Sequence, residues 1–215
     1  LRVIGAAVML IAMVVLVSMY IGSSEPELAS DPTQLLALVA MCGAAVSAGA
    51  LLSADPWRAE IIPVMATVTI VAIVHNRALA LLVGFCLCVM VAFATLESLE
   101  HFSLLMLLCV TVIVPLKTVS SRSTIIKIGF VAALVGFSSV WGLNLLQAHP
   151  MAEFWQNSAI LKESLKLSGW SLVCCFLVAG SLPFIERAFG IVTDISLLEL
   201  TAVSHPLLQE LARRA

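Results

Sequence analysis

Charged residues are scarce in this sequence, since Asp, Glu, Lys and Arg together make up 11% of 215 residues, against about 25% in ordinary soluble domains. The 11 Lys and Arg nearly balance the 13 Asp and Glu, so the chain lacks the basic surface that nucleic-acid binding requires. A disordered chain would be far less apolar. These absences exclude a lone soluble domain, a disordered segment and a nucleic-acid-binding module.

Hydrophobic residues fill the chain instead, at 61% of the sequence with a mean hydropathy of +1.12. A helix that crosses a bilayer needs about 20 mostly apolar residues. Uncharged runs of this kind recur seven times, at residues 3–22, 33–54, 61–76, 78–96, 102–116, 128–148 and 167–185. The sequence therefore predicts an all-α fold, a polytopic membrane bundle of seven transmembrane helices with the lipid bilayer as its first partner.

The third and fifth runs are shorter than the others, and each contains a proline, Pro63 or Pro115. A re-entrant segment that enters the membrane and turns back is the alternative at both places.

Positive residues choose the orientation, because Lys and Arg favour cytoplasmic loops. With seven crossings, the loops on the side of the C-terminal tail hold seven of the eleven Lys and Arg, and the other side holds four. We therefore expect a cytoplasmic C-terminus.

The connection before the last run has an amphipathic pattern over residues 149–166. Its apolar residues fall on one helical face, and they are Met151, Phe154, Trp155, Leu161 and Leu165. Such a pattern is typical of a helix in the headgroup plane. We expect an outer interfacial helix, with a docking lip for an extracellular domain or ligand as the alternative.

Asp, Glu, Lys and Arg are absent from all seven runs, which argues against proton-coupled transport. The polar residues within the runs are mainly Asn144, Thr67, Thr69, Ser138 and Ser139. They predict hydrogen bonds between helices or, in a transporter, a substrate path. The six cysteines lie inside the runs as small apolar residues, and the four histidines lie outside the apolar centres. We expect no catalytic residue, cofactor or metal ligand in this chain.

The tail after the last run departs from the membrane pattern. Gly190 is a natural stop for the preceding helix, and Asp194 can cap a short helix. Pro206, just after Ser204, suits the first turn of another. We divide the chain into a seven-helix domain over residues 1–189 and a cytoplasmic helical connector over residues 190–215.

The tail sequence LPFIERAFGIVTDISLLEL at residues 182–200, followed by HPLL at 205–208, closely resembles the junction in bacterial seven-transmembrane receptors with an intracellular HD hydrolase. The turn at residues 55–58 and the basic segment at 121–129 resemble the same family. The resemblance implies a signal connector, whose residues are Pro183, Glu186, Arg187, Gly190, Thr193, Asp194, Glu199, His205 and Pro206.

The resemblance further implies a bacterial inner-membrane protein in which an extracellular domain precedes the membrane helices and an HD domain follows them. Some members are cyclic di-AMP phosphodiesterases. HD hydrolases hold two metal ions with His and Asp residues that this chain lacks, so Mn or Fe is expected only in the HD domain beyond Ala215. The expected function is a sensory and anchoring domain that relays a signal to this enzyme, with a homodimer left open. The alternative is a small transporter or permease-like subunit.

Overall fold

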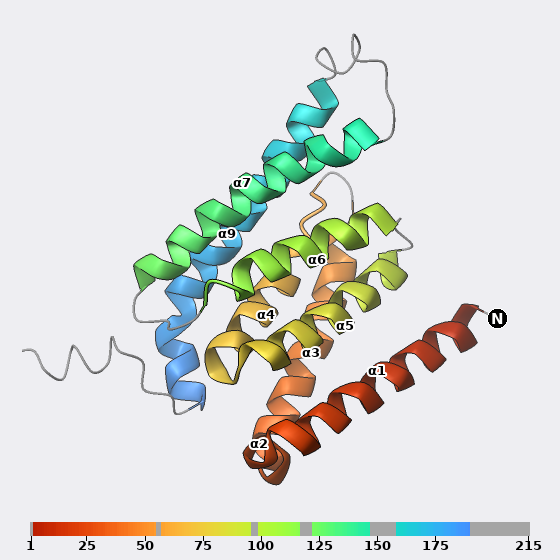
Figure 1. Ribbon diagram of the computed structural model, residues 1–215, viewed down its shortest axis with the longest axis vertical. Coiled ribbons are helices and arrows are strands. Elements are labelled where there is room, and N and C mark those ends of the chain that lie inside the picture. Colours follow the sequence, from red (N-terminus) through yellow and green to blue (C-terminus); the bar gives the residue numbers. More distant parts are fainter. Residues whose placement is uncertain (1, 55–56, 96–98, 117–121, 147–157, 190–215) are drawn as a thin grey trace, which may run out of the picture.

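The computed structural model describes residues 2–54, 57–95, 99–116, 122–146 and 158–189, and every regular element in these ranges is a helix (Figure 1). This confirms the all-α class. The helices are α1 (Arg2–Ser24), α2 (Pro26–Ser30), α3 (Pro32–Leu52), α4 (Ile61–Val74), α5 (Arg77–Thr95), α6 (Leu99–Ile113), α7 (Arg122–Leu146) and α9 (Ser158–Phe189).

Four of these helices, α3, α5, α7 and α9, are long and apolar enough to cross a membrane. The apolar part of α1 that the structure describes, and helices α4 and α6, are shorter. Four candidate spans are therefore established by length and composition, and the total of seven remains a prediction.

Helix α4 is the centre of the bundle, packed against α3, α5, α6 and α9. Its residues Val64, Met65, Val68 and Val71 are fully buried. A proline is tolerated in the first turn of a helix, because the backbone N–H groups there have no helical acceptor, and Pro63 occupies this position in α4. The 14 residues extend only about 21 Å, which suits a helix that is surrounded by protein rather than by lipid.

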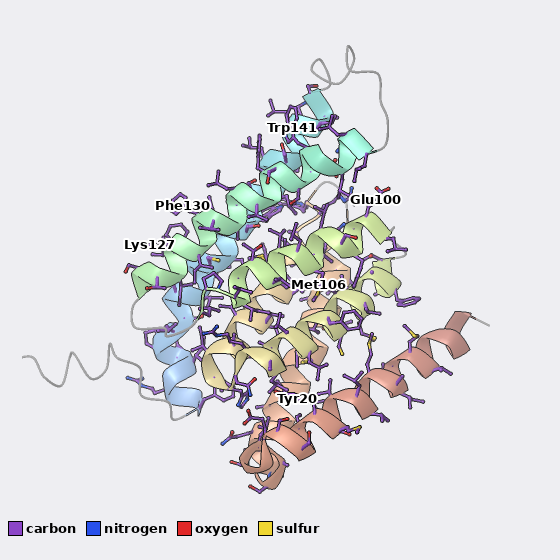
Figure 2. The ribbon with its side chains drawn as sticks, in the orientation of Figure 1. Tyr20, Glu100, Met106, Lys127, Phe130 and Trp141 are labelled. Carbon is purple, nitrogen blue, oxygen red and sulfur yellow. The ribbon has the colours of Figure 1, made fainter. Side chains whose placement is uncertain are left out.

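The two ends of the bundle can be named from α4. The Glu60 end comprises the turn at residues 57–60 and the first turns of α6 and α9. The Phe189 end comprises the α4–α5 turn, the end of α6 and the end of α9. In Figure 2, Glu100 and Trp141 lie toward the first end, and Tyr20 and Lys127 toward the second.

Helices α4 and α6 each run from one end to the other without reversing. Glu60, directly before α4, contacts His101 in the first turn of α6, and the residues after α6 contact Arg77 after α4. Helix α6 ends at Ile113, before Pro115, because a proline disfavours helical geometry in the residue before it. Each of the two short runs forms one unbroken helix, and complete crossing of the membrane by these helices stays a prediction.

Helix α9 differs from the sequence-based expectation. Residues 158–166 are its first turns, continuous with the last apolar run, so this half of the expected interfacial segment is not a separate helix in the headgroup plane. The physical reason is that no glycine or proline occurs within residues 158–168 to end the helix before the apolar run. The other half, residues 149–157, lies outside the described residues. With 32 residues, α9 is about 48 Å long and exceeds the roughly 30 Å hydrocarbon core.

The helix pair α7 and α9 has the most extensive contact in the molecule (Figure 1). A Cβ added to Gly129 of α7 would lie 2.7 Å from the Cβ of Cys175 on α9. This position requires glycine because the two backbones approach too closely for any side chain.

Helix α1 lies at the edge of the bundle and contacts α5 and α2 (Figure 1). The short helix α2 separates α1 from α3 along the chain, and α1 packs against α5 rather than against α3. Large apolar side chains of α1, such as Ile11 and Met19, are exposed. In a membrane these side chains face lipid.

Candidate functional site

The Glu60 end holds a buried acid–base pair. Glu60 Oε1 lies 3.1 Å from His101 Nε2, and the exposed fractions of the two side chains are 5% and 12%. The other carboxylate oxygen, Glu60 Oε2, is buried and has no hydrogen-bond partner among the described residues. A buried charge is costly unless it is paired, so the pair holds the start of α4 to the start of α6.

Electrostatics at this pair act in opposite directions. Burial raises the pKa of Glu60, but the imidazole of His101, a backbone hydrogen bond and the charge of Arg58 together outweigh it, so the pKa lies below its usual range. The carboxyl group is therefore ionised at neutral pH.

The turn before Glu60 is fastened to α9. Trp170 Nε1 donates a hydrogen bond of 3.0 Å to the carbonyl oxygen of Trp57, and the ring centroids of the two tryptophans are 6.1 Å apart. Arg58 Nη1 lies 3.6 Å from Glu163 Oε1 on α9. Arg58 has a φ of 42°, a left-handed backbone that costs a non-glycine residue roughly 1–2 kcal/mol.

The Phe189 end is built differently. Arg77 donates from Nε to the carbonyl oxygen of Leu116 at 3.1 Å and from Nη1 to that of Val114 at 3.4 Å. These carbonyls follow α6, where the negative end of the helix dipole favours a cation. The guanidinium therefore joins the start of α5 to the end of α6.

Two further contacts complete this end. The Asn76 amide donates to Glu25, between α1 and α2, while its oxygen accepts from the backbone N–H of Leu79. The ring of His75 meets the ring of Phe189 edge-on, with centroids 6.5 Å apart. The α4–α5 turn thus touches the last described residue of α9.

The predicted connector is described only at its start. Pro183 and Arg187 lie within α9, as does the backbone of Glu186. Pro183, six residues before the end of α9, cannot donate a helical hydrogen bond, which weakens the hydrogen-bond ladder of the helix there. The remaining connector residues, Gly190, Thr193, Asp194, Glu199, His205 and Pro206, lie outside the described residues.

The polar groups within the helices line no common path. Thr69, Ser138, Ser139 and Asn144 each donate to a carbonyl of their own helix, so the expected bonds between helices are not formed by these four residues. Ser168 does bond across the α7–α9 contact, to the carbonyl of Ala133 at 2.9 Å. No observation favours the transporter alternative.

Metal-binding groups are likewise not assembled in the part of the chain that the structure describes. No three His, Cys, Asp or Glu residues converge there. All six cysteines are free thiols, and the closest contact between two of them is the 3.8 Å approach of Cys88 Sγ and Cys109 Sγ.

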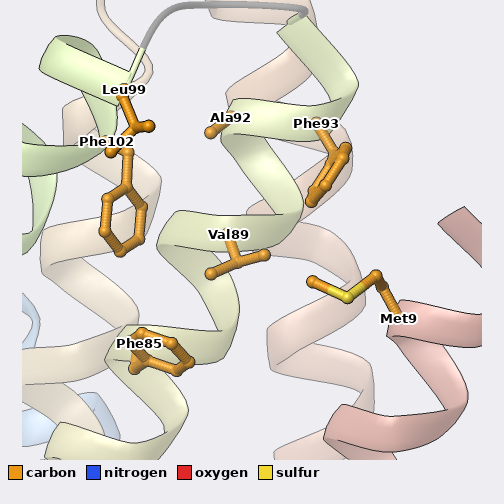
Figure 3. A pocket seen from close by; sticks show the side chains of 7 residues that line it. All are labelled: Met9, Phe85, Val89, Ala92, Phe93, Leu99 and Phe102. Carbon is orange, nitrogen blue, oxygen red and sulfur yellow. The ribbon is translucent and has the colours of Figure 1, made fainter.

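An apolar groove of about 450 Å³ lies between α1, α5 and α6 (Figure 3). Seven side chains line it, and they are Met9, Phe85, Val89, Ala92, Phe93, Leu99 and Phe102. All are hydrophobic, so the groove offers no group to orient a polar substrate or to perform chemistry.

Sequence reasoning missed the Glu60–His101 pair. A charged residue just before each apolar run is the ordinary pattern of a membrane boundary, so neither residue stands out. Their separation in sequence gives no signal of contact, and only the packing of α4 against α6 brings them together.

The helical architecture, the membrane-length apolar helices and the lipid-facing apolar surface define the chain as a multi-pass membrane domain. The family model described as "7TM receptor with intracellular HD hydrolase" matches residues 1–193. The chain therefore belongs to this family, as the tail motif predicts. No curated protein and no solved structure matches the chain.

Proposed function

We propose that this chain is the sensory and anchoring membrane domain of an HD-type metal-dependent phosphohydrolase. Its seven helices cross the bacterial inner membrane with the Phe189 end in the cytoplasm. The domain relays a signal to a following HD domain, which holds Mn or Fe and hydrolyses cyclic di-AMP. An extracellular domain precedes Leu1, and residues 190–215 form the connector.

One observation supports α9 as the helix that transmits the signal. Helix α9 contacts the turn at the Glu60 end, through Trp57 and Arg58, and also the turn at the Phe189 end, through His75. A continuous helix passes translation and rotation along its length, because its backbone bonds are internal. Family membership supports an HD hydrolase as the domain that receives this movement, since an intracellular HD hydrolase is part of the family description.

The experiment is to uncouple α9 from the next domain. Two or three Gly-Ser residues inserted after Gly190 in the full-length protein form a flexible joint that dissipates movement. Hydrolysis of cyclic di-AMP should persist, because the catalytic residues lie outside this chain, but its response to the stimulus should be lost. The matched control is the same insertion between α5 and α6, which should leave the response intact because it does not interrupt the path from α9 to the next domain.

An insertion variant that still responds fully would reduce the domain to an anchor. The substrate is tested separately, by comparing cyclic di-AMP with cyclic di-GMP in the presence of Mn²⁺. Orientation is tested with single cysteines in a cysteine-free background. Positions 121 and 212 should resist an impermeant thiol reagent in intact cells, and positions 98 and 157 should react.

A further inference from the structure

The Glu60–His101 contact has three properties that a purely structural ion pair does not need. It joins two helices at one end of the bundle, it leaves Glu60 Oε2 buried without a partner, and one member is a histidine. Histidine is the side chain whose charge ordinarily changes between about pH 5 and 8.

The strength of the contact depends on the charge of the imidazole. A protonated His101 neutralises the Glu60 carboxylate at 3.1 Å. A neutral ring leaves the buried negative charge uncompensated, because neither Glu60 Oε2 nor His101 Nε2 has a hydrogen-bond partner among the described residues. Burial of an unpaired carboxylate is unfavourable, so loss of the proton from His101 favours movement of Glu60 toward water.

Other charges near the pair come from each element around it. Arg58 in the turn acts on the Glu60 carboxylate, and Glu163 on α9 pairs with Arg58. Glu100 precedes His101 on α6. The attraction of Arg58 to Glu60 is shared with Glu163, whereas the His101 ring lies 3.1 Å from the Glu60 carboxylate.

Movement of Glu60 cannot be confined to its own side chain. Ala59, the preceding residue, is 3% exposed, and its N–H donates to the carbonyl of Leu52. The same short turn carries Trp57 and Arg58, which hold α9.

We propose that Glu60 and His101 form a pH-sensitive latch, which closes when His101 is protonated and then fixes residues 57–60 against α4, α6 and α9. The proposal deepens the proposed function and rests on it, because it names acidification on the outer side as a stimulus that reaches α9. The latch itself can be measured without any hydrolase activity.

The test uses the full-length protein in lipid nanodiscs, in a cysteine-free background. A reporter cysteine at the buried position of Ala59 and a matched one at the exposed position of Ala54 are labelled with a maleimide from pH 5 to 8. The Ala54 reporter corrects for the effect of pH on the reagent and the thiol. The ratio of the two rates, Ala59 reporter over Ala54 reporter, should rise about tenfold toward pH 8 as local opening of the turn becomes more favourable.

Two substitutions decide the origin of this change. His101→Gln and Glu60→Gln should each make the ratio constant with pH, while His75→Gln, a histidine at the Phe189 end, should keep the native profile. A second readout, the distance between spin labels at positions 54 and 158, should broaden at pH 8 in the native background and stay independent of pH in His101→Gln.

A native ratio that is constant between pH 5 and 8, or a pH dependence that persists in His101→Gln, would overturn the latch. Opening of the turn without any change in the 54–158 distances would overturn its link to α9. These outcomes are independent of the linker insertion after Gly190, so a failure of the latch and a failure of the relay can be told apart.

Discussion

The two ends of this bundle are fastened by different chemistry. At the Glu60 end, a carboxylate and an imidazole meet at 3.1 Å, mostly buried. At the Phe189 end, the Arg77 guanidinium donates to backbone carbonyls. The first contact depends on two titratable groups, whereas arginine stays charged and carbonyls do not titrate. The Glu60–His101 contact thus involves titratable groups and the Arg77 contact does not, and α9 touches both ends.

The largest expected effect comes from breaking the buried pair. His101→Ala leaves the Glu60 carboxylate buried without its partner, which should lower the free energy of unfolding by about 3–5 kcal/mol. The measurement is SDS-induced unfolding in mixed micelles at pH 6. The double variant Glu60→Met/His101→Leu removes both charges and should recover most of the loss. A single-variant loss below about 1 kcal/mol would mean that the pair behaves as an exposed one.

The corresponding change at the other end is Arg77→Ala. It removes charge-assisted hydrogen bonds to the carbonyls of Leu116 and Val114, and the expected loss of stability is about 1.5–3 kcal/mol. Unlike the loss in His101→Ala, it should be the same at pH 6 and pH 8. Arg187→Ala, at an exposed position in the last turn of α9, is the control and should cost at most about 1 kcal/mol. A pH-dependent effect of Arg77→Ala would contradict the contrast between the ends.

The α7–α9 contact lies between the two ends, and we expect one added Cβ atom at this contact to lower the stability of the protein. Gly129→Ala places a Cβ 2.7 Å from that of Cys175, and overpacking of this kind costs roughly 1–3 kcal/mol. Gly142→Ala on the same helix is the matched control, because nothing lies within 4 Å of the added carbon. It should be neutral or stabilising in the same unfolding assay. Equal effects of the two variants would show that α7 and α9 are not in close backbone contact.

The smallest effect concerns the backbone of the turn. Arg58→Gly and Arg58→Ala both remove the partly exposed ion pair with Glu163, but only glycine adopts a φ of 42° without strain. The glycine variant should therefore be more stable than the alanine variant by roughly 1 kcal/mol, as measured by thermal unfolding in detergent. The opposite order would mean that the turn relaxes to another backbone conformation.

Glu60 adds a pH signature to this comparison. Its pKa in the folded protein lies below the usual 4.5, so its ionised form stabilises the fold above that pH. This stabilisation is lost as the pH falls below 4.5 through the folded pKa.

Some helix boundaries could be predicted from the sequence. The apolar runs at residues 33–54 and 78–96 agree with α3 and α5 to within two residues, because charged or turn-forming residues flank them closely. The run at 128–148 misses the first six residues of α7, and the run at 167–185 misses the first nine residues and the last four residues of α9. Both segments omitted at the helix starts contain lysine, and a hydropathy criterion stops at a charge where the helix does not.

The sequence alone determined the membrane class, the family and the absence of Asp, Glu, Lys and Arg from the apolar runs. These properties depend on composition and on a contiguous motif at residues 182–200. Only the tertiary structure decided that α4 is the buried centre, that Glu60 meets His101, and that His75 meets Phe189. These contacts join residues from different helices, and their energy comes from packing and desolvation in three dimensions, which a linear pattern of apolar runs does not encode.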